Sequence, residues 1–172
     1  MWYRPTSPYR TAKPMAGGLA AALAMLLTGC GGAAEIACTQ IAALPGIAVT
    51  VDPTAAATLT GLTLRVCVGT ECAAHRVQLV PGSDSVDQGC EGPSPDSPCS
   101  ATARPNGTQV GFVDIPDLPA GPLTVSARVT SRGGATSLPP VQIVAEPSYP
   151  NGRQCPASAN QAAVTVGASA LR

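Results

Sequence analysis

Aromatic residues are scarce in this chain of 172 residues, which has one Trp, one Phe and three Tyr. Trp2, Tyr3 and Tyr9 lie within the first nine positions, so Phe112 and Tyr149 are the only aromatic residues after residue 30. Aromatic side chains bury the largest areas in protein cores. Their scarcity predicts a core of Val, Leu, Ile and Ala, and it argues against a carbohydrate-directed site, which needs stacking surfaces.

Lysine and histidine are nearly absent as well. Lys13 is the only lysine and His75 the only histidine, and the chain from residue 30 onwards has seven arginines against ten acidic residues, a formal charge of −3. Such a chain lacks the clustered cations that nucleic acid binding requires. No Gly-x-Ser-x-Gly or Ser-x-x-Lys motif supplies a nucleophile for His75. We therefore expect no nucleic acid partner, and we expect His75 to be an exposed strand residue.

A basic segment followed by an apolar one opens the chain. Arg4, Arg10 and Lys13 precede an apolar run over residues 15–27, and no acidic residue occurs among them. A membrane-spanning helix needs about 20 apolar residues. A positive start, a shorter apolar run and small residues before a cut site are instead typical of a secretory signal peptide. Residues 1–29 are therefore predicted to be a cleaved signal peptide, and the small residues at 30–37 a flexible tether.

The apolar run ends in Leu27-Thr28-Gly29-Cys30, which resembles the lipobox of bacterial lipoprotein precursors. With its six further cysteines and its Lys-poor composition rich in Ala, Gly and Pro, the chain is similar to the small uncharacterised lipoproteins of high-GC Gram-positive bacteria such as actinomycetes. The resemblance implies cleavage between Gly29 and Cys30. It implies a lipid anchor on Cys30, with a diacylglycerol on the sulfur and palmitate as the fatty acid. It also implies a place at the extracytoplasmic face of the cell membrane, and it brings no catalytic site with it.

Six cysteines remain once Cys30 is assigned to lipid, and an even number in an exported chain is typical of disulfides. Six cysteines allow many pairings, so the sequence leaves the connectivity open. Local spacing suggests one set, in which two bridges are local and the third ties the start of the domain to its end: Cys67 with Cys72, Cys90 with Cys99, and Cys38 with Cys155.

Metal ligation is the alternative use of these residues. Cys67, Cys72 and His75 are close in sequence, but the paired Cys-x2-Cys spacing of structural zinc sites is absent. Four acidic residues share the segment 83–107, yet their spacing does not match a calcium-binding loop; they are Asp84, Asp87, Glu91 and Asp96. We therefore expect a solvated acidic loop, with no metal and no cofactor.

Short apolar runs separated by Pro and Gly fill the chain after residue 38. Alternation of apolar and polar positions is clearest in residues 62–68 and 122–131, and Pro139-Pro140 suits the edge of a sheet. Seven strands are predicted, at residues 46–51, 62–68, 73–80, 108–115, 122–131, 136–145 and 162–166, with a long irregular stretch at 83–107. The pattern predicts an all-β fold, a single antiparallel β-sandwich of immunoglobulin-like type over residues 38–172.

No motif in the sequence assembles a catalytic group. Asp114, Asp117 and His75 are the residues that a cell-wall-directed hydrolase would use, although the two aspartates at a strand end are typical of turns. We therefore favour a non-enzymatic binding or structural module of the cell envelope. Residues 83–107 would contact an envelope protein, because function concentrates in long loops. The oligomeric state stays open.

Overall fold

The alternating pattern around residues 62–68 forms a strand because Leu62, Leu64 and Val66 point into the core while the residues between them face outwards. The structure is a computed structural model that describes residues 37–172, of which Cys38–Arg172 form one compact unit. The signal peptide, the Cys30 anchor and nearly all of the tether expected from the sequence lie outside the described residues. The elements are β1 (Gly46–Val51), α2 (Pro53–Ala56), β2 (Leu59–Val68), β3 (Glu71–Val77), β4 (Leu79–Cys90), β5 (Cys99–Asp114), β6 (Gly121–Ser131), β7 (Gly134–Ser148) and β8 (Ala159–Val166).

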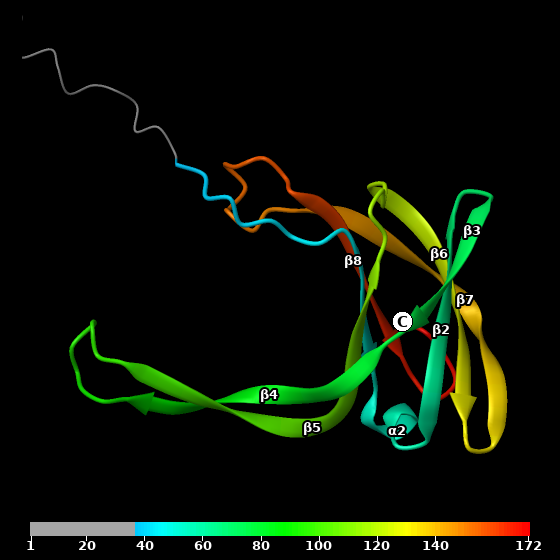
Figure 1. Cartoon of the computed structure of the whole chain (residues 1–172), viewed down its shortest axis with the longest axis horizontal. Coiled ribbons are helices and arrows are strands. Elements are labelled where there is room, and N and C mark those ends of the chain that lie inside the picture. The colour runs from blue at the N-terminus through cyan, green and yellow to red at the C-terminus, as the bar shows by residue number, and fades with distance from the viewer. Residues whose placement is uncertain (1–36) are drawn as a thin grey trace, which may run out of the picture. The chain divides into compact units, whose positions relative to one another are not determined.

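The eight strands follow one another in an open sheet in the order β3-β2-β6-β7-β8-β1-β5-β4 (Figure 1). The sheet folds over into two layers because β7 pairs with β6 through residues 134–145 and with β8 through residues 146–148. We call the layer β3-β2-β6-β7 sheet B and the layer β7-β8-β1-β5-β4 sheet A. The expected all-β sandwich is confirmed, with eight strands and with one parallel pair, β1 and β8, among antiparallel neighbours.

The core lies between the two layers and is aliphatic, as the shortage of aromatic residues predicts. The best-buried side chains are at most 2% exposed and come from both sheets: Ile47, Val49, Val51, Leu62, Leu64, Leu123, Val125, Ala145, Val164 and Val166. Within residues 37–172 no polar or charged side chain is buried. Burial of each Val, Leu or Ile stabilises the fold by about 1.5–3 kcal/mol, so side chains of moderate size suffice when both faces of the core contribute them.

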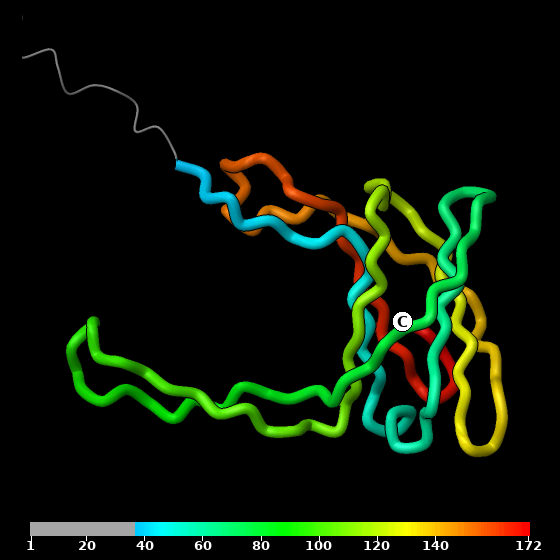
Figure 2. Tube along the Cα trace, viewed as in Figure 1, coloured from blue at the N-terminus to red at the C-terminus, as the bar shows by residue number. Residues whose placement is uncertain are grey.

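Residues 83–107 are the largest departure from the sequence prediction, because they pair rather than form an irregular loop. β4 and β5 form a ladder that continues to the pair Cys90 and Cys99, and only residues 91–98 connect them. Figures 1 and 2 show this hairpin projecting from the body. The prediction was wrong because glycines that looked like loop signals serve as bulges. Gly89 and Gly107, with φ of 82° and 80°, lie where the register of the ladder shifts.

Pro139 and Pro140 lie in a bulge of β7, between Leu138 and Val141, where the register against β6 shifts. Their stretch of β7 pairs with β6 on one side only, so the expected edge position is confirmed. A further difference from prediction is the break at Gln78, where the chain leaves β3 in sheet B and enters β4 in sheet A.

Helix contributes little to the described residues. There, α2 has four residues, and no helix is long and apolar enough to cross a membrane.

Candidate functional site

The six cysteines of the described region form three disulfides, and these are the pairs that local spacing suggests. Cys67–Cys72 joins β2 to β3 across a two-residue turn, and Cys90–Cys99 closes the far end of the β4–β5 ladder. The third bridge, Cys38–Cys155, joins residues 117 positions apart. The cysteines are therefore occupied with one another. Over residues 37–172 no three His, Cys, Asp or Glu side chains are grouped so that they could hold a metal ion.

The first projection from the body is the long hairpin, residues 83–107. None of its residues is buried. It pairs only with itself, because β1 reaches β5 no further than residue 109. An isolated two-stranded ribbon is marginally stable in water, so we infer that the Cys90–Cys99 bridge at its far end helps to hold it. Both of its edges expose unpaired backbone groups, which can accept a further strand from a partner.

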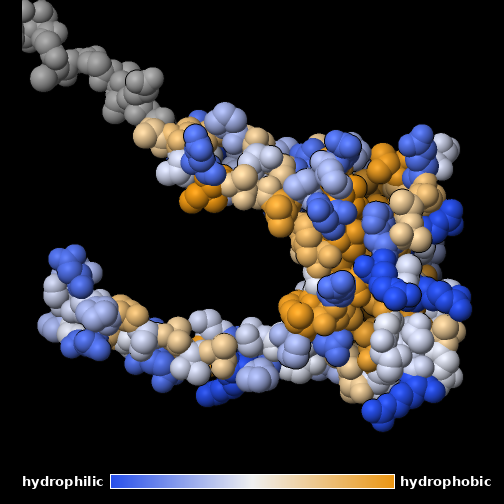
Figure 3. Space-filling view, in the orientation of Figure 1, coloured by the Kyte–Doolittle hydropathy of each residue, from blue (hydrophilic) through white to orange (hydrophobic). Residues whose placement is uncertain are grey.

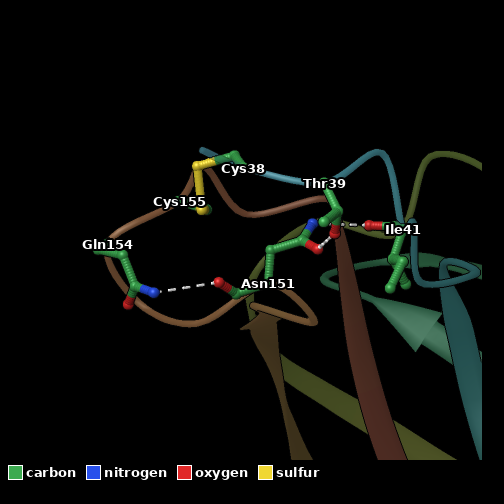
Figure 4. The surroundings of a disulfide bond; sticks show 6 residues. All are labelled: Cys38, Thr39, Ile41, Asn151, Gln154 and Cys155. Atoms are coloured by element: carbon green, nitrogen blue, oxygen red, sulfur yellow. Dashed lines mark hydrogen bonds between the residues drawn. A yellow bond between two sulfur atoms is a disulfide. The ribbon is translucent and has the colours of Figure 1, made fainter. Parts of the chain in front are cut away.

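The second projection, which we call the stapled projection, consists of residues 38–45 and 149–158. Cys38–Cys155 joins its two segments, and the Asn151 side chain contacts Thr39 and donates from Nδ2 to the Ile41 carbonyl at 2.9 Å (Figure 4). Gln161 Nε2 donates to the Leu44 carbonyl at 2.8 Å. These contacts replace a regular ladder with side-chain hydrogen bonds and a disulfide, so the segment that follows the predicted tether is fixed to sheet A.

Between the two projections, the outer face of sheet A is mostly apolar, with Asp114 and Gln161 at its border and Thr50 and Thr165 in the row of Val110. Ala48 on β1 pairs with Phe112 on one side and with Ala163 on the other, so the three side chains lie side by side. Val80 and Val110 pair with each other on the same face. A shallow hollow of about 360 Å³ is lined by Ala48, Phe112, Val144, Glu146, Gln161, Ala162 and Ala163. We use the name floor for this apolar surface, formed by Ala48, Val80, Val110, Phe112, Val144 and Ala163.

Two observations show that the floor is open to solvent. Val80 and Val144 are 57% and 58% exposed, although both are large apolar side chains. In Figure 3 the space between the two projections is bounded by apolar side chains, shown in orange, where the projections leave the body. The floor is therefore a concave apolar surface with ordered walls on two sides.

Phe112 is the largest side chain of the floor, and the sequence prediction missed it. A Cβ atom at Gly46 would lie 2.8 Å from two carbons of the Phe112 ring, so the ring lies closely over this glycine. The chain's only phenylalanine thus lies on the outer face rather than in the core. Its position in the alternation of β5, one residue before the buried Val113, was the signal that could have revealed this.

The residues of the hydrolase alternative are not brought into one group. His75 is half-buried rather than exposed, and it lines a separate hollow of about 290 Å³ with Glu71, Ile115 and Leu118 among others. Asp114 and Asp117 are exposed and do not line that hollow. In the part of the chain that the structure describes, no hydrogen bond or salt bridge joins either aspartate to His75.

The four acidic residues of the long hairpin are exposed and do not converge. Asp84 accepts a hydrogen bond from Asn106 Nδ2 at 2.8 Å, and Asp87 accepts one from the Gly89 backbone N–H at 2.7 Å. These contacts stabilise the ribbon itself. The residues expected to form a solvated acidic loop are instead distributed along an ordered hairpin and its connecting turn.

Comparisons with known proteins found no match to any family model, curated protein or solved structure. The floor offers apolar contact, Glu146 and Gln161 offer hydrogen bonds at its border, and the long hairpin offers unpaired backbone groups. This combination suits the binding of a polypeptide.

Proposed function

We propose that the protein is a non-enzymatic binding module of the cell envelope, which holds a partner protein in the space between the long hairpin and the stapled projection. The floor is the observation that supports this most strongly. Removing apolar area from water contributes about 25 cal/mol per Å². A contiguous apolar surface left open between two disulfide-closed walls is typical of a contact surface for another molecule.

A protein fits this space better than a sugar does. The floor contains one aromatic ring, Phe112, and the other aromatic residue of the described part, Tyr149, has the Arg153 guanidinium 5.5 Å from its ring centroid. Sugar sites rely on several stacking surfaces. A polypeptide can place apolar side chains on the floor and add its backbone to a free edge of the hairpin.

The proposed cellular location of the module rests on the sequence. Cys30 would carry the lipid, and each buried CH2 of its acyl chains would contribute about 0.8 kcal/mol to membrane binding. Three disulfides support an exported location, because disulfides persist in oxidising compartments and are rare in the cytosol. The proposed module therefore works at the extracytoplasmic face of the cell membrane, with Cys38 a few residues after the anchor.

The floor is tested by a Phe112→Asp variant. A carboxylate at this position would have to be desolvated without a partner, which costs several kcal/mol, so we expect capture of the partner to fall at least tenfold. A photoreactive residue at Val80, introduced in the protein's own cells, would report capture as a crosslinked band. Thr124→Asp, which places the same charge on the outer face of sheet B, is the matched control and should leave the band unchanged. An equally strong band from Phe112→Asp would contradict the proposed site.

The anchor is tested by a Cys30→Ser variant. Without the acceptor sulfur the chain should move from the membrane fraction to the soluble fraction and keep its three disulfides, because the described cysteines pair among themselves. Cell fractionation measures the first property, the intact mass before and after reduction measures the second, and far-UV circular dichroism checks the fold. A misfolded variant would mean that Cys30 belongs to the disulfide framework, and a folded variant that stays in the membrane fraction would contradict the lipid anchor.

A further inference from the structure

The outer face of sheet B has a different character from the floor, because three arginines project from it. Arg76, Thr63 and Arg128 lie in one row across β3, β2 and β6, and Arg65 lies in the parallel row that contains Ser126. All three arginines are exposed. Neighbouring strands are about 4.8 Å apart, so the row places Arg76 and Arg128 about 10 Å from each other at their backbones. We call Arg65, Arg76 and Arg128 the arginine face.

No carboxylate compensates this charge. β2 and β6 contain no acidic residue, and Glu71 of β3 points to the opposite side, where it lines the hollow that contains His75. Within residues 37–172 the one salt bridge joins Arg172 to Asp52. Shallow hollows of about 340 and 350 Å³ flank the row and share Thr63, and further hydroxyl groups line them, those of Thr60, Thr130, Ser126 and Ser137. The arginine face therefore offers three free guanidinium groups beside hydroxyl donors.

The matching negative charge lies at the far end of the long hairpin. Residues 85–103 contain Asp87, Glu91 and Asp96 and no basic residue. All three carboxylates are exposed, and the Cys90–Cys99 bridge holds the ribbon that presents them. We call Asp87, Glu91 and Asp96 the acidic tip. Its formal charge of −3 equals in size the +3 of the arginine face.

We infer that the acidic tip of one copy docks on the arginine face of a second copy. Figure 1 shows the hairpin projecting from the sheet A side of the body, with β2, β3 and β6 on the far side, so the two surfaces cannot meet within one molecule. Arginine pairs with carboxylates through two parallel hydrogen bonds, which makes the contact specific as well as attractive.

Such a contact is head-to-tail, because two different surfaces meet. It can continue from copy to copy into a ring or a row. No residue of the floor belongs to either of the two surfaces that meet. An assembly of this kind is independent of the proposed partner, and it would multiply the number of floors presented together. Because the contact is made by exposed charges, it weakens as ionic strength rises.

The test reverses the charges of the two surfaces in two variants of the full chain, which are studied in neutral detergent micelles. Donor and acceptor fluorescent proteins fused at the C-terminus report association of copies as energy transfer. One variant carries Arg65→Glu, Arg76→Glu and Arg128→Glu, and the other carries Asp87→Arg, Glu91→Arg and Asp96→Arg. Wild-type copies should show energy transfer at about 20 mM salt that is lost at about 500 mM. Each variant alone should associate at least tenfold more weakly, and a mixture of the two should restore the transfer.

A matched control tests whether any added negative charge would weaken association. Arg132→Glu with Arg153→Glu adds negative charge away from the arginine face and should leave association unchanged, and the melting temperature of each variant checks that it folds. The inference is overturned if wild-type copies stay monomeric at low salt, or if the two reversed variants do not associate with each other. It is also overturned if inorganic polyphosphate binds the arginine face while the copies do not associate, because a polyanion would then be the occupant.

Discussion

Replacing Cys38 and Cys155 together with serine is expected to lower the free energy of unfolding by about 5 kcal/mol. The bridge joins residues 117 positions apart and so encloses most of the described chain. In the chain-entropy model a disulfide acts on the unfolded chain, and it restricts a long loop more than a short one. Since a domain is stable by only about 5–15 kcal/mol, the variant should unfold at a much lower urea concentration, which equilibrium unfolding measures.

The matched comparison is Cys67→Ser with Cys72→Ser, which removes a bridge of separation 5. The same model gives a loss of about 2 kcal/mol for so short a loop. The two double variants make the same chemical change, so the expected difference of about 3 kcal/mol between them arises mainly from loop length. Equal losses would show that local packing, and not loop length, sets the contribution of these bridges.

Gly46→Ala should lower the free energy of unfolding by about 3 kcal/mol or more. Its Cβ would meet the Val113 carbonyl oxygen and, at 2.8 Å, the ring of Phe112. Gly46 also has a φ of 151°, which residues with a side chain rarely adopt. Either the β1–β5 ladder or the ring must therefore move. Urea unfolding measures the stability, and crosslinking from Val80 measures the effect on the floor.

Gly61→Ala is the control for this substitution. Gly61 also lies in a strand, but the nearest atom to its Cβ, on Thr130, is 3.6 Å away, which is an ordinary contact, and its φ is not positive. Its stability should change by no more than about 0.5 kcal/mol. If Gly46→Ala were equally mild, the sheet and the Phe112 ring would adjust without cost, and the close approach of ring and glycine would not hold the floor in place.

Strands with clear alternation were predictable from the sequence. Residues 46–51 match β1, and residues 122–131 match β6 within one residue. In both, apolar side chains alternate with small or polar ones, and this pattern buries one face only when the backbone is extended. The two local disulfide pairs were suggested for a related reason, since cysteines that flank a short turn face each other when the chain reverses, and Cys38 with Cys155 was the pair that remained.

The long hairpin was not predictable in the same way. Its residues are exposed on both faces, so no alternation marks them, and its glycines and prolines resemble loop signals. Elsewhere in the fold, burial of one face holds a strand in place. In the long hairpin, hydrogen-bonded pairing between β4 and β5 does so instead, and this pairing connects residues on two sides of a turn. A local pattern contains no information about such a partner.

The amino-acid sequence by itself determined an aliphatic core, short strands and an even set of cysteines, because composition and alternation act on neighbouring residues. Only the tertiary structure decided what the outward faces do. Alternation predicts that Phe112 and Arg65 leave the core, but not which strands lie beside theirs. Pairing of distant strands places Phe112 beside Ala48 and Ala163, and it places three arginines on one face without a carboxylate. Both candidate surfaces arise from this pairing, because a surface needs neighbours that are distant in the chain.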